Sequence, residues 1–254
     1  MARIGGEYIN NFDDARATGM FEGAENVETG YYICEWFVFG MQDAGHILVD
    51  HHANKGVYER QMRDVSNGGD DAQFTDACDV FLIITHGNYA NHELELLFDI
   101  EKDTWTGESK EWSFGDRCGL KWLMIYGCQS IDGAHVQEHL HIFHPMHLFC
   151  GSYGYMYDSW TVDDAGSNLC DNLTSGEIVS DSWGDAVSDW WVANHPMVLS
   201  VERKETYNGG NPDWSTTVIG GDHFLGAGTV MPDIPLNDQY YMATYSWSGG
   251  LYDG

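Results

Sequence analysis

Hydrophobic residues along this chain gather in short runs, separated by polar and glycine-rich segments. Two runs stand out, residues 79–85 (DVFLIIT) and residues 120–126 (LKWLMIY). Both are rich in β-branched or aromatic residues, and both are shorter than a typical helix. Such runs are typical of fully buried strands in a parallel sheet. We therefore expect two neighbouring core strands here.

The rest of the chain alternates between strand-like and helix-like patterns. Further strands are expected over residues 3–11, 31–40, 147–153 and 197–201. Helical spacing predicts helices over residues 57–65, 133–143, 163–173 and 180–191. The long polar connection 88–119 is expected to form a hairpin or a flap, and His51-His52 a loop. This alternation predicts an α/β fold with a mainly parallel sheet flanked by helices.

The length of 254 residues favours one domain, with a core over about residues 31–202 and an irregular, glycine-rich extension over 203–254. No apolar run approaches the ~20 residues that a membrane-spanning helix needs. The first residues, MARIGGEY, lack the basic and apolar regions of a secretory signal, which favours a cytoplasmic protein. The pattern leaves the oligomeric state open.

Acidic residues dominate the charge of the chain. There are 40 Asp and Glu against 11 Lys and Arg, which gives a formal net charge of −29. The acids are spread along the whole sequence rather than gathered in a tail, so we expect a salt-adapted, halophilic protein whose self-repulsion is relieved by screening. The chain has no basic stripe that would neutralise phosphates, which argues against a nucleic-acid partner.

Reactive side chains follow the two strongest strands. The first leads into His86-Gly87, and the second into Gly127-Cys128. Catalytic groups of open α/β sheets gather beyond the carboxyl ends of the strands, so a thiol and an imidazole are expected to meet there. The backbone N–H groups of Gly87 and Cys128 are the candidates for an oxyanion hole. The other five cysteines, at positions 34, 78, 118, 150 and 170, form no Cys-x-x-Cys pair and are expected to be structural.

These residues carry a resemblance. An apolar block that ends in His-Gly, followed by a block that ends in a small residue and Cys 42 positions after the His, resembles the caspase-like (clan CD) cysteine peptidases. Residues 79–195 also resemble an uncharacterised prokaryotic family of that clan, through Cys128-Gln129, Met146-His147 and the segment 182–191. The chain has YGCQS where caspases have a QACRG-type pentapeptide, so specificity for Asp is not implied.

The resemblance implies a three-layer caspase-like sandwich and a cysteine endopeptidase that acts on a peptide or protein substrate. Cys128 would be the nucleophile and His86 the base. Three acids after the next strand, Asp158, Asp163 and Asp164, are candidates for a pocket that selects Arg or Lys before the cleaved bond. The alternative from another class is a catalytically silent caspase-like module for binding or assembly.

A second alternative is metal chemistry. Residues 135–139 (HVQEH) fit the H-x-x-E-H pattern, in which two histidines four apart on a helix share Zn²⁺ and the Glu serves as base. His135 and His139 would then be the metal ligands of a zinc-dependent hydrolase. The acidic pairs Asp70-Asp71 and Asp163-Asp164 are weaker candidates for Ca²⁺, since neither fits an EF-hand loop. On the peptidase interpretation no cofactor is expected.

Overall fold

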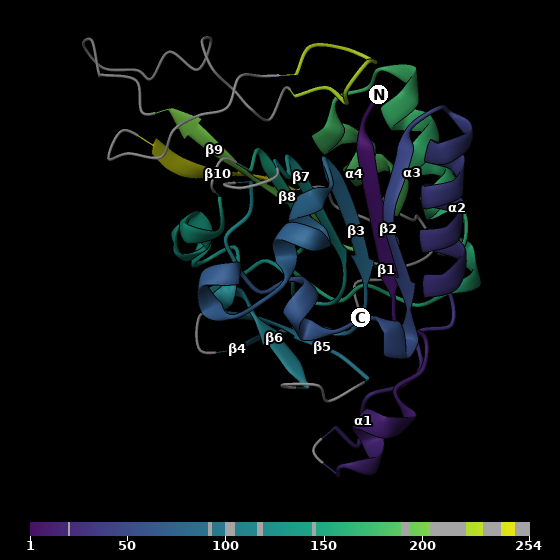
Figure 1. Ribbon diagram of the computed structural model, residues 1–254, viewed down its shortest axis with the longest axis vertical. Coiled ribbons are helices and arrows are strands. Elements are labelled where there is room, and N and C mark those ends of the chain that lie inside the picture. Colours follow the sequence, from purple (N-terminus) through teal and green to yellow (C-terminus); the bar gives the residue numbers. More distant parts are fainter. Residues whose placement is uncertain are drawn as a thin grey trace.

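The computed structural model describes residues 1–19, 21–90, 93–99, 105–115, 119–143, 146–188, 194–203, 222–230 and 240–246. Seven of the strands are β1 (Arg3–Tyr8), β2 (Ile47–Ala53), β3 (Val80–Ile84), β7 (Trp122–Tyr126), β8 (Leu148–Ser152), β9 (Pro196–Arg203) and β10 (Tyr240–Ser246). They form one sheet in the order β10-β9-β8-β7-β3-β1-β2 (Figure 1). The strands from β8 to β2 are parallel, and β9 and β10 extend the sheet antiparallel at one edge. The predicted α/β class with a mainly parallel sheet is confirmed.

Different layers cover the two faces of this sheet. The α-helices within the described residues are α1 (Asp13–Ala17), α2 (Gly30–Asp43), α3 (Ala165–Ser175) and α4 (Val179–Val187). Helix α2 packs on β1, α3 packs between α2 and α4, and α4 packs on β8 and β9 (Figure 1). Two glycines of β1 show the alternation of faces, because a Cβ on Gly6 would meet Val38 of α2, whereas a Cβ on Gly5 would meet Cys78. Cys78 follows a series of short 3-10 turns over residues 54–77 that lies on the face away from α2.

The connection after β3 forms a second, smaller sheet. Its strands are β4 (Gly87–Ala90), β5 (Glu93–Leu97) and β6 (Thr106–Glu108), all antiparallel, in the order β4-β5-β6. The first two make the hairpin that the sequence predicted for this connection. Because β4 begins at Gly87, this small sheet starts directly beside His86.

The two strongest apolar runs are confirmed as central strands. Every residue of β3 and of β7 is buried, and the two strands pair in parallel from Val80 with Trp122 to Ile84 with Tyr126. A strand inside a sheet that is covered on both faces meets apolar neighbours above and below it, which explains the continuous rather than alternating pattern.

The expected strand over residues 31–40 is wrong, because this segment lies within helix α2. Its aromatic and β-branched residues suggest a strand, but its buried residues recur at helical spacing: Ile33, Cys34, Phe37, Val38 and Met41. The exposed face of the helix is also aromatic: Tyr31, Tyr32, Trp36 and Phe39. Since both faces are apolar, the hydrophobic pattern does not reveal the helical period.

Other local expectations also differ from the structure. Residues 57–65 contain only the short 3-10 turns Glu59–Gln61 and Val65–Asn67, where a helix was expected. Residues 133–143 contain a 3-10 helix, Val136–Ile142, instead of an α-helix. The pair His51-His52 belongs to β2 and not to a loop.

The central sheet extends beyond the core that was expected over residues 31–202. Strand β1 pairs with β2 on one side and with β3 on the other, so residues near the amino terminus are part of the core. At the other end, β10 lies in the glycine-rich extension, which was expected to be irregular with possible β pieces.

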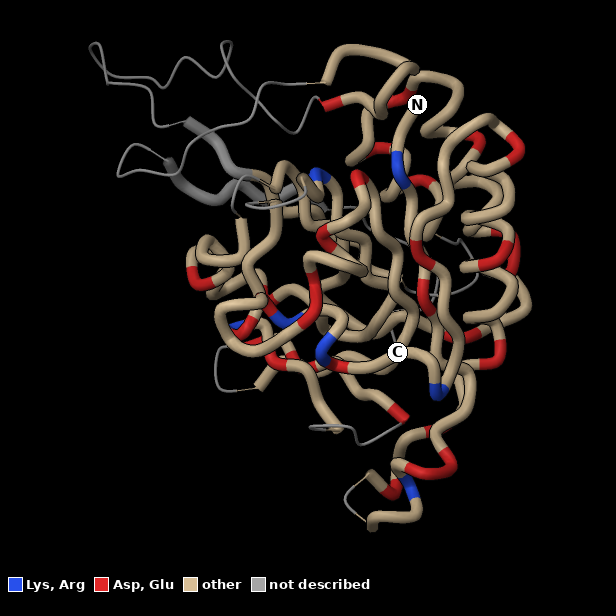
Figure 2. Tube along the Cα trace, in the orientation of Figure 1, with Lys and Arg blue, Asp and Glu red and all other residues tan. Residues whose placement is uncertain are grey.

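Over the described part of the trace, acidic residues occur in many separate segments rather than in one region (Figure 2). They occur on helices, turns and loops alike, whereas Lys and Arg are few and scattered. No single element carries the negative charge.

Candidate functional site

The site lies at the carboxyl ends of β3 and β7. The parallel pairing continues past the last strand residues, since the backbone N–H of Thr85 donates to the carbonyl of Tyr126 at 3.3 Å. His86 directly follows Thr85, and Cys128 lies two residues after Tyr126. Both residues therefore emerge at the same edge of the sheet, where they line one pocket. The structure therefore brings the two predicted catalytic residues to one site.

Two glycines allow the chains to approach each other at this point. A Cβ on Gly87 would lie 2.4 Å from the carbonyl oxygen of Cys128, and one on Gly127 would lie 2.9 Å from the carbonyl oxygen of Thr85. Contacts this short exclude any side chain unless the backbone moves. The His-Gly and Gly-Cys pairs of the sequence are thus required by the packing of one turn against the other.

The orientation of His86 is set by a backbone group that the sequence did not reveal. Its Nε2 lies 2.6 Å from the carbonyl oxygen of Glu25, and its ring packs against Phe12 at a centroid distance of 4.6 Å. A carbonyl oxygen only accepts hydrogen bonds, so Nε2 is the protonated nitrogen. In the neutral ring the lone pair is then on Nδ1, which leaves that atom as the proton acceptor.

Cys128 is partly buried, and its thiol contacts the backbone of Met156. The N–H of Met156 donates to Sγ at 3.3 Å, and Sγ lies 3.6 Å from the carbonyl oxygen of the same residue. Burial raises the pKa of the Cys128 thiol, although hydrogen bonds from the backbone of Met156 and of Cys128 itself lower it in part. The resting group is therefore a neutral thiol, and it needs a base to become nucleophilic.

The chain turns sharply straight after the cysteine. Gln129 has a φ of 48°, in the left-handed region that few residues other than glycine adopt. Its N–H donates to the carbonyl of Gly154 at 2.7 Å, which ties the turn to the loop after β8. This loop also contains Met156, so one loop fixes both the turn and the thiol.

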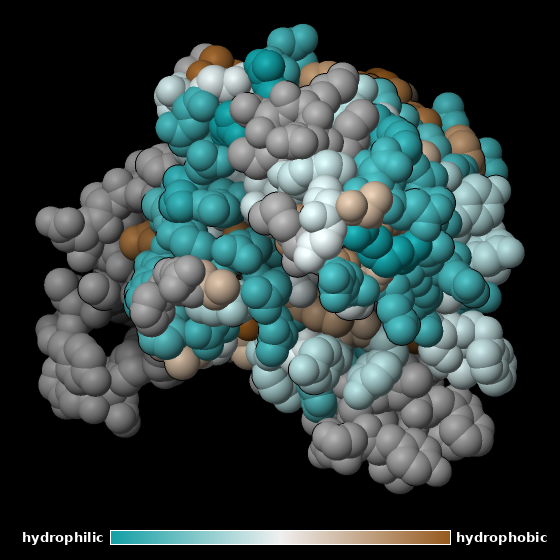
Figure 3. All heavy atoms as spheres, turned by 90° about the horizontal axis from the view of Figure 1, so that it is seen from below, coloured by the Kyte–Doolittle hydropathy of each residue, from teal (hydrophilic) through white to brown (hydrophobic). Residues whose placement is uncertain are grey.

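The pocket beside these residues has a volume of about 540 Å³. Among the described residues that line it, three are acidic: Glu25, Glu28 and Asp158. Arg16, the one Lys or Arg in this described lining, donates to the carbonyl of Ala24 at 2.7 Å and forms an ion pair with Asp13. The end of the molecule seen in Figure 3, at which β1 and β3 terminate, is largely hydrophilic. Because three acidic residues line the pocket and Arg16 is already paired with Asp13, the pocket has an excess of negative charge.

The three acids that were expected to select the substrate lie in two places. Asp158 lines the pocket of Cys128 and accepts hydrogen bonds from the backbone N–H of Glu28 at 2.5 Å and of Thr29 at 2.8 Å. Asp163 and Asp164 line a separate hollow, together with Trp36 and Trp160. The structure thus brings only one of the three to the candidate site.

The arrangement of the HVQEH segment differs from the one a zinc helix requires. It is a 3-10 helix, in which residues four apart do not share a face. His135 contacts Asp132 at 2.5 Å, whereas His139 is buried between the rings of Tyr89 and Phe149. Burial lowers the pKa of His139 to about 4. Among the described residues, the segment contributes to no group of three side chains spaced to ligate a metal.

The acidic pair Asp70-Asp71 is engaged in local structure. Asp70 forms an ion pair with Arg60 at 3.3 Å, and an oxygen of Asp71 accepts hydrogen bonds from the backbone of Val65 and Ala72. These contacts stabilise the 3-10 turns of this segment.

Comparisons with known proteins place the chain in a family without identifying a reaction. The sequence model of a family described as "Domain of unknown function (DUF6345)" matches residues 10–249, so the chain belongs to that family. A search of curated proteins matched none.

Among solved structures, the chain is similar to the initiator caspase Dronc of Drosophila, with 14% identity and a TM-score of 0.40. The match covers 66% of this chain and 63% of the Dronc chain, which is less than two thirds of the latter. Within the described residues, no helix is long and apolar enough to cross a membrane.

Proposed function

For this member of the DUF6345 family, we propose a cysteine endopeptidase that uses Cys128 as nucleophile and His86 as base. One observation carries the proposal: both side chains line the same pocket from the ends of paired parallel strands, with the backbones of their neighbouring glycines in contact. Thiol and imidazole are the side chains that nucleophilic catalysis of this type requires. The resemblance of residues 79–195 to caspase-like peptidases supports the same assignment.

In the proposed reaction, His86 removes the proton from the thiol of Cys128, and the thiolate attacks the carbonyl carbon of the peptide bond. The carbonyl oxygen becomes negatively charged and is stabilised by the N–H groups of Gly87 and Cys128. The C–N bond then breaks, and His86 gives its proton to the departing amine. A thioester remains on Cys128. Water, which loses its proton to His86, hydrolyses this thioester and restores the thiol.

The contact between His86 and Glu25 supports this role for the histidine. Because Nε2 donates to the carbonyl of Glu25, Nδ1 is the atom that accepts the proton of the thiol. When the ring becomes positively charged, the same carbonyl stabilises it. The thiol has a raised pKa, so proton transfer has to accompany attack instead of preceding it in the resting protein.

We assign Arg or Lys as the residue before the cleaved bond. Glu25, Glu28 and Asp158 bring three carboxylates to the pocket, whereas Arg16 is neutralised by its own ion pair. Charge-assisted hydrogen bonds to a cationic side chain would be stronger there than any contact with an acidic one. The carboxylate of Asp158 already accepts backbone hydrogen bonds, so Glu25 and Glu28 are the better candidates for direct contact.

The test is labelling of the full chain with irreversible, thiol-directed peptidyl probes that carry Arg, Lys, Asp or Asn before the reactive group. We expect labelling at Cys128, fastest with Arg or Lys, and its loss in Cys128→Ala. The His86→Ala variant should label at least about 100-fold more slowly, because general-base assistance typically contributes 100-fold or more. Low and molar salt are compared, so that an unfolded chain is not mistaken for an inactive one.

Two variants serve as matched controls. Cys170→Ala removes another free thiol, and His135→Ala removes another partly exposed imidazole; neither residue lines the pocket. Both should label like the wild type. If the folded wild type is not labelled by any probe at either salt concentration, the peptidase assignment fails and the silent caspase-like module becomes the better interpretation. Equal labelling of several cysteines would also contradict a dedicated nucleophile.

A further inference from the structure

A second group of reactive side chains lies between β1 and β2, outside the pocket of Cys128. In the parallel register Glu7 is opposite His52, and Gly5 is opposite Asp50. Side chains of a strand alternate between its faces, so Glu7, Asp50 and His52 all project from the face away from α2. Their neighbour His51 projects from the other face, where its ring contacts Tyr8 and Phe39.

The ligand atoms of these three residues lie within 4.8 Å of one another. Glu7 is fully buried and Asp50 is 4% exposed. Neither carboxylate oxygen of Glu7 has a hydrogen-bond donor among the described residues, and the same is true of Oδ2 of Asp50. The other oxygen of Asp50 contacts Nε2 of His52 at 3.0 Å. A carboxylate buried without a donor strongly destabilises the folded state unless a proton or a cation compensates its charge.

The electrostatics favour a positive ligand. Burial, and then the neighbouring charge of Asp50, raise the pKa of Glu7 well above its usual range. Burial also raises the pKa of Asp50, while His52 lowers it in part. Without a cation, one proton has to be shared between the two carboxyl groups. A divalent cation would replace that proton and neutralise both.

We propose that Glu7, Asp50 and His52 bind one divalent transition-metal ion. A donor set of two carboxylate oxygens and one imidazole nitrogen fits Zn²⁺ best, with water as a fourth ligand. Ca²⁺ and Mg²⁺ fit less well, since they prefer oxygen ligands only.

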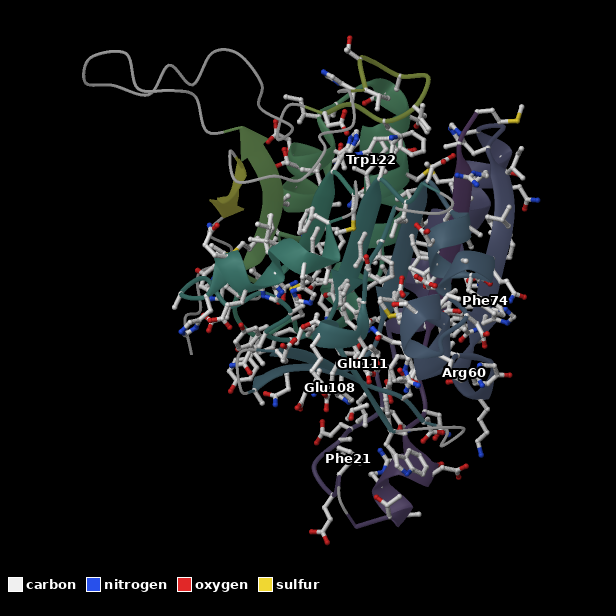
Figure 4. All side chains as sticks on the ribbon, turned by 60° about the vertical axis from the view of Figure 1, so that its left-hand side comes forward. Phe21, Arg60, Phe74, Glu108, Glu111 and Trp122 are labelled. Carbon is white, nitrogen blue, oxygen red and sulfur yellow. The ribbon has the colours of Figure 1, made fainter. Side chains whose placement is uncertain are left out.

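The surroundings of the three residues suit such a site. The His52 side chain is 39% exposed, which gives an ion a path from solvent. The ring of Phe74 contacts the ring of His52 at a centroid distance of 5.8 Å. Phe74 belongs to the segment of 3-10 turns on which Figure 4 labels Arg60 and Phe74. The ion would link β1 to β2, which is the edge strand of the sheet. No ligand of this site lines the Cys128 pocket, so the inference is independent of the proposed peptidase activity.

The test uses the full chain, freed of metal by a chelator that is then removed. Zn²⁺, Mn²⁺ and Ca²⁺ are titrated separately, with bound metal measured by equilibrium dialysis and unfolding followed by heat. We expect one tightly bound Zn²⁺ per chain. The unfolding midpoint should rise by about 5 to 10 °C when the metal is about 100-fold above its Kd. Affinity should increase with pH, because the metal competes with the shared proton.

Three variants decide whether these residues are the ligands. Glu7→Gln keeps the shape of the side chain but removes its charge, and His52→Gln changes a residue that is partly exposed, so the second variant tests the site if the first does not fold. Glu7→Gln and His52→Gln should each weaken Zn²⁺ binding by about 100-fold or more, since replacing even a residue that only orients a ligand lowers metal affinity by about 10- to 100-fold. His51→Gln, one residue away on the opposite face, should bind like the wild type.

Three outcomes would overturn the inference. The first is Zn²⁺ affinity that is unchanged in Glu7→Gln and His52→Gln, which would place the ion elsewhere. The second is tight binding of Ca²⁺ with no binding of Zn²⁺. The third is the absence of any bound metal at a pH where both carboxyl groups ionise, which would leave a proton-sharing pair of acids.

Discussion

Single atoms decide the geometry around Cys128. The absence of a Cβ at Gly87 lets its backbone approach the carbonyl of Cys128, and one carbonyl, that of Glu25, selects the tautomer of His86. Neither effect depends on the identity of a distant side chain. Glu25 orients His86 through its backbone carbonyl, so the type of its side chain does not reveal this role in the sequence.

His139 leads to a prediction about pH. This imidazole is 1% exposed and its Nε2 has no hydrogen-bond partner in the described structure. Burial lowers its pKa to about 4, whereas in the unfolded chain it titrates near its ordinary value of 6.5. As the pH falls below 6.5, the unfolded state binds a proton that the folded state does not, so stability is lost down to about pH 4. The loss is at most about 3 kcal/mol.

Urea unfolding of the wild type and of His139→Phe at several pH values between 7 and 4 measures this effect. The variant keeps an aromatic ring next to Tyr89 and Phe149 but has no group to titrate. The stability of the variant relative to the wild type should therefore increase as the pH falls. His135→Gln, at a partly exposed position, is the control and should not reproduce this gain. A constant difference between wild type and His139→Phe would show that the imidazole is not held neutral.

At the scale of elements, the start of α2 depends on a residue far away in the sequence. Asp158 accepts hydrogen bonds from the backbone of Glu28 and Thr29 and from the hydroxyl of Thr29, just before the first residue of the helix. These N–H groups have no partner within the helix, so an acceptor there acts like a helix cap. The loop after β8 thereby fixes one wall of the Cys128 pocket.

Replacement of this acid should be measurable as a loss of stability. Asp158→Ala is expected to lower the free energy of unfolding by about 1 to 2 kcal/mol, the usual cost of losing such a cap. Asp164→Ala is a matched control, because Asp164 precedes α3 but makes no side-chain cap hydrogen bond. Its effect should stay within about 0.5 kcal/mol. Urea unfolding at neutral pH compares the two, and equal losses would contradict a capping role for Asp158.

At the scale of the whole molecule, the negative charge is the dominant property. The chain has a formal charge of −29, its acidic residues lie in many separate segments, and few Lys and Arg are available to pair with them (Figure 2). Repulsion of this kind opposes the compact state and acts over the Debye length, which shortens from about 10 Å at 0.1 M salt to about 3 Å at 1 M.

Stability should therefore increase with salt. We expect the urea midpoint of unfolding to rise steadily between low and molar KCl, with urea chosen because it carries no charge itself. A variant with Asp43→Lys, Asp171→Lys and Asp181→Lys, all at exposed positions, reduces the net charge and should show a smaller rise. A midpoint that does not change with KCl, or that rises equally in the variant, would contradict adaptation to salt through surface charge.

The local composition of the sequence was sufficient to predict an element where burial alone determines its residue types. The runs that became β3 and β7 are buried on both faces, so their apolar, β-branched sequence identifies them as core strands without further information. The order of His86 and Cys128 after these strands then follows from the chain itself. This is why the α/β class, and the position of His86 and Cys128 at one edge of the sheet, were predictable.

Prediction from local composition failed where packing against a neighbouring element decides which secondary structure the hydrophobic pattern forms. Helix α2 is apolar on its exposed face as well as on its buried face, so only its packing against β1 distinguishes it from a strand. The 3-10 form of residues 136–142 removes the shared face that the HVQEH spacing predicted. Burial, not sequence, leaves His139 neutral.

The sequence by itself thus determined the two central strands β3 and β7, the sheet edge at which the reactive residues emerge, and the net charge, because these depend on residue types and their order. The tertiary structure decided which groups meet at that edge and elsewhere. It brought the carbonyl of Glu25 to His86, separated Asp158 from Asp163 and Asp164, and placed Glu7 against Asp50 and His52. Such contacts join residues that are distant in the chain, and the register of the strands fixes them.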